Sequence, residues 1–373
     1  PGKERHRGVM TPSFMSCRDL PRKQKGGCKR QVSQALKEVW LQRLTWGPDQ
    51  QRSWDVQLWL GIFPVHWRQL SDPSLLTGQI DAISAALDGT YSDLLVAMVT
   101  NPALQISLNG PANHQRKPNE NFARELLELF SVGEGHFSEK DVSEAARALT
   151  GFRLDGQGVL ALVSRRHDQG QKTVLGKTDA FDGISLARWL AQQPATAEFI
   201  AQRVWRQLIG TTPPVQRLQD LARTWRLQGL SIPWLMSELR MSPEAKQSRI
   251  AGLRLSDPID LVARSLRLIG SRHPDAIALS LRGLRAMGQA PFEPPNVSGW
   301  PVNEQWINLR WLQARRRTIL QLLRDEEVWE TRSLPLRLDN ALTGRPPLTL
   351  SLPAESNRET LAQLFRDPVW QLS

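Results

Sequence analysis

A mainly α fold is predicted: a multi-helix globular domain with one small β-ribbon around residues 151–178. Three observations predict it. Apolar residues recur at three- and four-residue spacing through most of the chain, as they do in amphipathic helices. Several apolar runs end at a polar residue followed by Pro, which disfavours helical angles in the residue before it. Between residues 151 and 176, five glycines interrupt short β-rich runs, and this pattern favours a hairpin.

The helical pattern begins near Gln34 and is expected to end at Gly47-Pro48, because both residue types stop helices. The aromatic-rich segment 54–67 is expected to be buried. A Pro- and Gly-rich loop is expected at 291–301. Apolar spacing predicts the remaining helices over 72–87, 93–100, 184–192, 195–209, 215–228, 232–240, 258–268, 275–287, 309–323 and 361–367.

Charge and composition divide the chain into three parts. Residues 1–32 are predicted to be a basic disordered arm, 33–325 a helical domain, and 326–373 a Pro-rich linker with a C-terminal helix that packs on the same domain. Residues 1–30 hold nine Lys or Arg and two acidic residues, 9 − 2 = +7 of the net charge of +11. Because this basicity lies in an arm and not in a patterned surface of a fold, a nucleic-acid partner is not expected.

Both cysteines, Cys17 and Cys28, lie in the predicted arm and are interpreted as free thiols. A disulfide between them would close only a short loop, and no nearby His or third Cys completes a zinc site. The chain has no apolar run of the ~20 residues that a transmembrane helix needs. The arm also lacks the apolar middle of a signal peptide, so the sequence leaves localisation open.

The segment 118–150 carries most of the candidate site residues. A helical wheel separates an apolar face from a polar face with Glu120, Arg124 and Glu128 at four-residue spacing, so that Arg124 can bridge two carboxylates. Asn121 and Glu125 form a parallel row. A second helix is expected after Ser138, which begins a capping-box pattern with Asp141, and it places Glu144 and Arg147 three residues apart.

Two interpretations of this acidic face remain open. It is either a solvated helix surface, or it lines a cleft in which carboxylates beside an arginine bind a sugar or a cation, or act as general acid and base. In the second case the predicted catalytic residues are Glu125, Glu128, His167 and Asp168. The predicted binding residues are Asn119, Glu120, Asn121, Arg124, Arg147, Asn296 and Trp300.

The pair His167-Asp168 is a candidate because a carboxylate can fix the tautomer of a histidine and raise its basicity. Adjacent residues of a strand point to opposite faces, however, and Asp168 could instead cap the turn at Gly170. The loop 294–301 combines a rigid backbone with Trp300, which suits stacking on a sugar or a peptide; the alternative is a structural loop whose indole fills the core. The run of arginines at 315–317 is interpreted as a solvated helix face.

Known catalytic motifs are absent from the sequence. It contains no Walker loop, GxSxG elbow, HExxH pair or CxxC pair, which disfavours NTPase, common serine hydrolase and zincin mechanisms. No cofactor or metal site is identified, although the acidic face could hold a divalent cation.

The segment PNENFARELLELFSVGEGHFSEKDVSEAARALTGF resembles the bacterial "domain of unknown function 1800" family, whose hallmark is NENxARELxELxxxG followed by DVxEAARxLTG. Further segments support the resemblance in order: HDQGQKTVLG, PATAEFIAQRVWRQLIG and LRAMGQAPFEPPNVSGWPVNEQWIN. The family usually has a long segment between an LNRLTFGP-like start and an FWxxHF-like helix, and this segment is missing here. The histidines of that helix are replaced by Leu60 and Ile62, which removes support for a role that depends on them.

The resemblance implies an exported bacterial protein, periplasmic or extracellular, that is often encoded beside a sulfatase-like protein. It names no substrate. The leading hypothesis is therefore a binding or assembly protein of the envelope, possessing the Glu120/Arg124/Glu125 face and the Trp300 loop, with a sulfatase-like partner and a carbohydrate or anionic ligand. The alternative is a hydrolase in which Glu125 or Glu128 acts with His167 and Asp168.

Overall fold

A computed structural model describes residues 14, 16–155, 158–332 and 357–372. Seventeen α-helices and two small antiparallel sheets make up this part of the chain, which confirms the mainly α prediction. The helices are α1 (Arg22–Trp46), α2 (Gln50–Ile62), α3 (Leu75–Ala86), α4 (Tyr91–Val99), α5 (Pro102–Ser107), α6 (Asn121–Glu128), α7 (Glu139–Ala148), α8 (Gly183–Ala191), α9 (Pro194–Leu208), α10 (Val215–Leu227), α11 (Ile232–Met241), α12 (Pro243–Ala251), α13 (Pro258–Ile269), α14 (Pro274–Ala286), α15 (Leu309–Arg324), α16 (Glu326–Glu330) and α17 (Arg358–Arg366).

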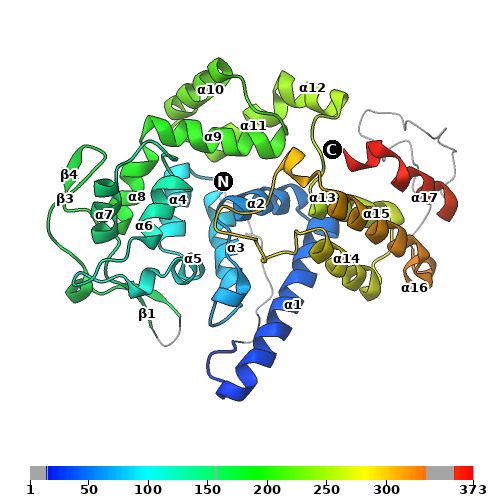
Figure 1. Ribbon diagram of the computed structural model, residues 1–373, viewed down its shortest axis with the longest axis horizontal. Coiled ribbons are helices and arrows are strands. Elements are labelled where there is room, and N and C mark those ends of the chain that lie inside the picture. The colour runs from blue at the N-terminus through cyan, green and yellow to red at the C-terminus, as the bar shows by residue number, and fades with distance from the viewer. Residues whose placement is uncertain (1–13, 15, 156–157, 333–356, 373) are drawn as a thin grey trace, which may run out of the picture.

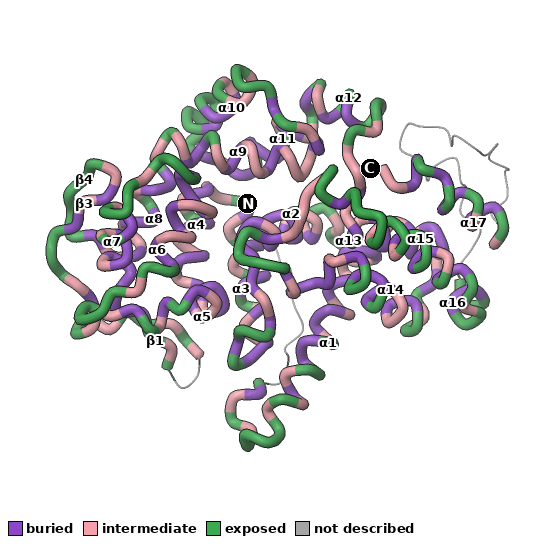
Figure 2. The backbone as a smooth tube through the Cα atoms, viewed as in Figure 1, coloured by how far each residue is buried: buried purple, intermediate pink, exposed green. Residues whose placement is uncertain are grey.

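The helices gather in groups around α2 and α3. Helices α4 to α8 lie on one side and α13 to α17 on the other, while α9 to α12 cross one edge and α1 projects from the opposite edge (Figure 1). Buried positions run through all of these groups, and the outermost helices α10 and α12 carry long exposed stretches (Figure 2). One apolar core cluster includes residues from Leu36 to Trp370, so the groups share a core.

Three Pro pairs explain several helix boundaries. Asn101, Ser242 and Asp367 each follow a helix and accept a hydrogen bond from a backbone N–H of the next helical turn, which begins at the following Pro. Each polar residue therefore stops one helix and caps the next, because Pro is favoured at the first helical position. The sequence pattern predicted the stops but not the short helices α5 and α12 that follow them.

The predicted ribbon is two separate hairpins. Strand β1 (Phe152–Leu154) pairs with β2 (Leu160–Leu162), with Arg153 opposite Ala161, and β3 (Lys172–Val174) pairs with β4 (Lys177–Asp179), with Thr173 opposite Thr178. The 3-10 helix η3 (Ser164–Arg166) stands between the two hairpins.

Two predictions for the N-terminal part are wrong. Residues 22–32 belong to α1 and are not a disordered arm. Cys17 and Cys28 form a disulfide and are not free thiols; both are buried, and they pack with Val32 in a small apolar cluster. Residues 1–13 of the predicted arm and most of the predicted linker, residues 333–356, lie outside the described residues. The predicted division into three parts is otherwise untested.

Candidate functional site

The polar face of α6 forms an ion pair with α7. The Arg124 guanidinium donates two hydrogen bonds of 2.8 Å to the carboxylate of Glu139, at the start of α7, and lies 3.5 Å from Glu120. These pairs are solvent-facing, since the side chain of Glu139 is 77% exposed. Arg124 thus joins the two helices of the segment 118–150 and does not bridge Glu120 to Glu128 as the four-residue spacing predicted.

The other predicted residues of α6 lie beside this ion pair. Asn119 accepts the backbone N–H of Asn121 (2.9 Å), and the Asn121 side chain donates to the Leu108 carbonyl (3.0 Å). These contacts order the start of the helix. Burial, and then the negative charge of Glu128, raise the pKa of the half-buried Glu125, while Arg124 opposes them.

A second network attaches the β3–β4 hairpin to α7. Arg147 donates to Asp168 (2.8 and 3.2 Å) and to Glu144 (2.9 and 3.0 Å), and Glu144 also accepts the backbone N–H of Thr173 (3.0 Å). The hydrogen bonds from Arg147 outweigh burial and hold the pKa of Asp168 below its usual value. Asp168 also accepts the N–H of Gly170, which is the turn cap considered from the sequence.

His167 and Asp168 have different partners. His167 is buried, and its Nδ1 lies 2.9 Å from the Thr150 carbonyl, whereas Asp168 pairs with Arg147. The contacts of His167, Asp168 and Arg147 hold the hairpin in place. No contact between His167 and either Glu125 or Glu128 is seen among the described residues. A catalytic role for the four residues predicted from the sequence, Glu125, Glu128, His167 and Asp168, therefore stays a prediction.

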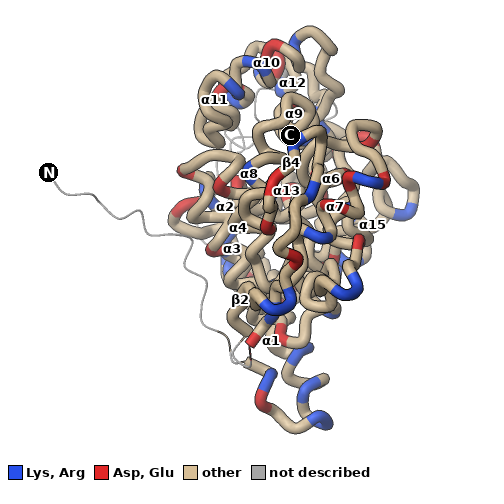
Figure 3. Tube along the Cα trace, turned by 90° about the vertical axis from the view of Figure 1, so that its left-hand side faces the viewer, with Lys and Arg blue, Asp and Glu red and all other residues tan. Residues whose placement is uncertain are grey.

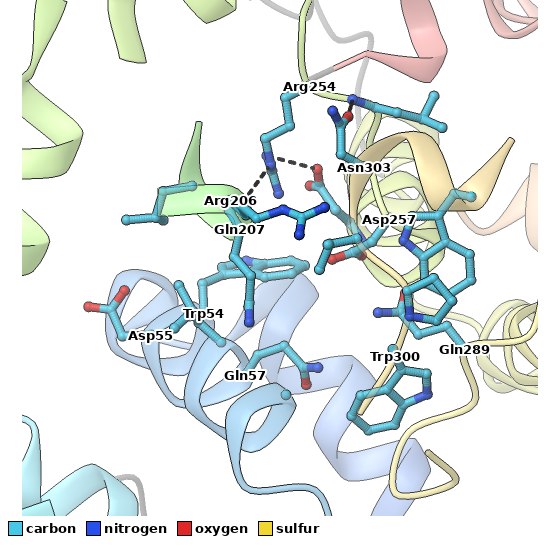
Figure 4. Close-up of a pocket in the computed structure, with 18 of the residues that line it drawn as sticks. Trp54, Asp55, Gln57, Arg206, Gln207, Arg254, Asp257, Gln289, Trp300 and Asn303 are labelled. Atoms are coloured by element: carbon cyan, nitrogen blue, oxygen red, sulfur yellow. Dashed lines mark hydrogen bonds and ion pairs between the residues drawn. The ribbon is translucent and has the colours of Figure 1, made fainter. Parts of the chain in front are cut away.

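A pocket of about 300 Å³ lies where α2, the end of α9, the start of α13 and the loop 288–306 meet (Figure 4). Five chain segments that are distant in sequence line it, the fifth being Arg240 of α11. Its side chains are mostly amides, guanidiniums, carboxylates and indoles, including Trp54, Gln57, Arg206, Gln207, Arg254, Asp257, Asp260, Gln289, Trp300, Asn303 and Trp306. Trp300 is the only predicted site residue that lines this pocket.

The amide side chains of the pocket are oriented by hydrogen bonds behind it. Gln57 accepts from the indole N–H of the buried Trp40 (2.7 Å), Gln289 accepts the Ile259 backbone N–H (2.9 Å), and Asn303 accepts the backbone N–H of Leu255 (2.7 Å). Amides that are fixed in this way can meet a ligand without first losing rotamer freedom.

The loop that carries Trp300 packs tightly on α2. Gly299 has φ +99°, and a Cβ added there would lie 2.4 Å from the Gly61 carbonyl oxygen. Only glycine fits both the angle and the close approach. Asn296, a predicted binding residue, accepts hydrogen bonds from the Ser298 N–H (3.0 Å) and hydroxyl (2.6 Å), and so shapes the turn before Trp300.

Two indole N–H groups at the pocket lack an acceptor. The Nε1 atoms of Trp300 and Trp306 are buried and have no hydrogen-bond partner among the described residues. Unsatisfied buried donors are uncommon in folded proteins, which makes them of interest wherever they border a cavity.

A charged cluster forms one wall of the pocket. Asp257 caps α13 by accepting the backbone N–H of Asp260 (2.8 Å), and Asp260 pairs with Arg264 (3.5 Å) and Arg254 (3.7 Å). Burial, and then the charge of Asp260, raise the pKa of Asp257. Neither carboxylate was predicted as a site residue, because Asp257-Pro258 is the pattern of a helix cap, which hides any second role.

The charged cluster also acts electrostatically on Arg315. The residue is fully buried, 0% exposed, although its arginine run was predicted to be a solvated face. Its three guanidinium nitrogens have no hydrogen-bond partner within the described part of the chain. Burial lowers the pKa of Arg315 to about 10, and the charges of Asp257 and Asp260 oppose this change.

The described residues contain no group of three or more His, Cys, Asp or Glu side chains placed to hold a metal ion. Within the same residues, no helix has the length and apolar character needed to cross a membrane. No curated protein and no solved structure matches the chain. The family model described as "Protein of unknown function (DUF1800)" matches residues 5–370. Nearly the whole chain is covered by that match, and the protein belongs to the DUF1800 family.

Proposed function

We propose that this protein is a carbohydrate-binding protein and that the sugar occupies the Trp300 pocket. The observation that carries the proposal is the pair of oriented amides, Gln57 and Gln289, on the Trp300 side of the pocket (Figure 4). Planar amide and guanidinium groups match pairs of sugar hydroxyls, and an indole offers an apolar face to the C–H groups of a sugar ring. The volume of about 300 Å³ is at the small end of ligand pockets and suits one or two sugar units.

The ring of Trp300 is partly exposed, so a sugar would meet its apolar face. The Nε1 atoms of Trp300 and Trp306 are themselves buried and are not offered to a ligand. Asp257 and Arg206, which both line the pocket, would supply further polar contacts. A neutral, hydroxyl-rich ligand suits this wall better than a simple anion, because the arginines here already face Asp257 and Asp260.

We further propose an exported protein that works in the bacterial envelope or outside the cell, with a sulfatase-like protein as a partner. The Cys17–Cys28 disulfide supports export, because disulfides persist mainly in oxidising compartments. The partner rests on the family resemblance alone.

Isothermal titration with a panel of neutral mono-, di- and oligosaccharides tests the carbohydrate proposal. We expect a member of the panel to bind, and Trp300→Ala to weaken its binding at least ten-fold. Trp234→Ala is the matched control, since Trp234 is a partly exposed indole on α11 outside the pocket, and we expect less than a two-fold change. Equal losses in the two variants, or no binding by the wild type, would contradict the proposal.

A hydrolase is the second candidate, and Asp257 is the observation that favours it. A buried carboxyl with a raised pKa can stay protonated and act as a general acid, while a neighbouring ionised carboxylate such as Asp260 acts as base or nucleophile. Asp257→Asn separates the candidates, because Asn is as good a helix cap as Asp and leaves α13 intact. Sugar release by the wild type that disappears in Asp257→Asn, with binding retained, would support hydrolysis.

A further inference from the structure

A second pocket, of about 580 Å³, lies between α1, α14 and the 3-10 helix η1 (Trp67–Gln69), and it shares no lining residue with the Trp300 pocket. None of its lining residues is acidic. Five are cationic: Lys29, Arg30, Lys37, Arg68 and Arg285. Basic residues are also drawn along the projecting end of α1 in Figure 3.

The positive charge of this pocket is only partly balanced. Glu293 pairs with Lys37 and with Arg285 (3.0 Å), and it also accepts the indole N–H of Trp67 (2.9 Å). One carboxylate therefore stands against five cations, 5 − 1 = +4. Lys29, Arg30 and Arg68 have no ion-pair partner in the described part of the chain.

Lys37 lies among the other cationic side chains of this pocket. Its side chain is only 3% exposed, and its amino group pairs with Glu293. Burial lowers the pKa of Lys37, and the positive charges of Arg285 and Arg68 lower it further against the attraction of Glu293. An anion bound beside Lys37 would reduce this repulsion.

The indole of the pocket offers no free face for stacking. Trp67 is 8% exposed, and the cations of Lys37 (5.2 Å) and Arg68 (5.4 Å) lie over its ring. A nucleobase or an aromatic ring would have to displace them. The pocket is therefore suited to binding a ligand through its charge and not through stacking. The planar guanidiniums of Arg30 and Arg68 can each form two hydrogen bonds to a tetrahedral oxyanion.

We propose that this pocket binds a ligand that carries two or more phosphate or sulfate groups. The cations come from three different elements and surround a space too large for one such group, so they suit a multiply charged ligand better than a single ion. Gln34 also lines the pocket, where its side-chain amide donates to Glu38 (2.8 Å).

The disulfide gives this pocket a rigid edge. Cys28 precedes Lys29 in α1, and its bond to the fully buried Cys17 ties the first turns of the helix to the chain segment before it. Reduction would release that segment and loosen Gly26, Lys29 and Arg30 together. We therefore expect reduced protein to bind the anion more weakly while its sugar binding is unchanged.

Titration calorimetry at low salt tests the proposal with two probes, sodium tripolyphosphate and sucrose octasulfate. We expect at least one to bind, and the probe that binds identifies the oxyanion. The double variant Arg30→Gln/Arg68→Gln should weaken binding at least ten-fold, and raising the salt should weaken binding to the wild type. Both arginines are exposed, so the variant is expected to fold, which circular dichroism checks.

The control is Arg116→Gln/Arg226→Gln, which removes two exposed arginines outside the pocket. We expect it to change the affinity less than two-fold. Binding of neither probe to the wild type would overturn the proposal, as would equal weakening in the two double variants, which would indicate a diffuse charge effect. The Trp300→Ala variant should bind the anionic probes normally, and so separates this site from the sugar pocket.

Discussion

The segment 119–168 and the Trp300 pocket use the same kinds of side chain in different ways. In the first, Glu144, Arg147 and Asp168 satisfy one another and attach a hairpin to a helix. In the second, indole N–H groups lack acceptors among the described residues, and the amides are oriented from behind. Polar residues that are near in sequence pair with each other, whereas the pocket brings five distant segments together around a space that a ligand can enter. The contacts seen in the segment 119–168 are structural, and a further role for its residues stays a prediction.

The largest expected effect comes from Arg147→Ala. It leaves Glu144 and Asp168 without their common partner in a half-buried site, and we expect a loss of about 3 kcal/mol in the free energy of unfolding. Denaturant titration measures it. Lys177→Ala removes a more exposed pair with Asp179, together with cation–π contacts to Phe181 and Trp189, and should cost clearly less. A stable Arg147→Ala protein that no longer binds sugar would reverse the comparison and make this network the functional site.

Glu293→Gln tests the electrostatics of the second pocket, which five Lys and Arg side chains line. Burial raises the pKa of Glu293, but hydrogen bonds from Arg285, Lys37 and Trp67 outweigh it and lower the pKa to about 2. A lowered carboxyl pKa stabilises the folded state above the unfolded pKa near 4.5, and that contribution is lost as the pH falls toward 2. We expect the variant to lose about 2 kcal/mol at pH 7.

Acid titration of stability checks this second prediction. The difference between the wild type and Glu293→Gln should shrink steadily from pH 5 downward, as followed by urea unfolding at each pH. A difference that stays constant over that range would show that the contribution of Glu293 to the free energy of unfolding does not depend on its charge.

Gly299→Ala tests how firmly the Trp300 loop is positioned. The new Cβ would meet the Gly61 carbonyl oxygen in a backbone of positive φ, and we expect a cost of about 2 kcal/mol together with loss of sugar binding. Gly135→Ala is the matched control: it has φ +82° but no neighbouring atom within 4 Å, so it should cost about 1 kcal/mol and leave binding intact. Equal costs in the two variants would show that the contact with α2 is unimportant.

The smallest expected effect is that of Glu125→Gln. A carboxyl whose folded pKa is raised stabilises the protein below its unfolded pKa and loses that contribution as the pH rises through the folded pKa. At pH 7 the ionised Glu125 is therefore unfavourable, and we expect the variant to be neutral or more stable, by up to about 0.5 kcal/mol. Thermal unfolding at pH 5 and pH 8 measures it. A variant that unfolds normally but abolishes a hydrolytic activity would instead establish Glu125 as catalytic.

Local signals in the sequence predicted much of the fold. Asp257-Pro258 and the capping box of Ser138 with Asp141 mark helix starts that the structure has at the same places, because caps depend on neighbouring residues only. The disulfide was missed since pairing of Cys17 with Cys28 requires the intervening turn and the early start of α1. Helical periodicity also failed for Arg315, which is buried among charges from other helices.

Local sequence patterns could not predict the Trp300 pocket. Trp300 was predicted as a binding residue, but Gln57 and Asp257 carry no motif, and only tertiary packing brings α2 and the start of α13 to the same cavity. The polar residues of the segment 119–168 are close in sequence and form a visible pattern, and several of them pair within the segment. A role for them in binding or catalysis stays a prediction.

Hydrogen exchange with and without a saturating oligosaccharide tests the central claim most directly. Our account predicts that the sugar slows amide exchange at 54–61 and 289–306, which line the Trp300 pocket, and leaves 119–128 and 164–172 unchanged. Protection confined to 119–128 and 164–172 would contradict it and would make the acidic face of α6 the binding site.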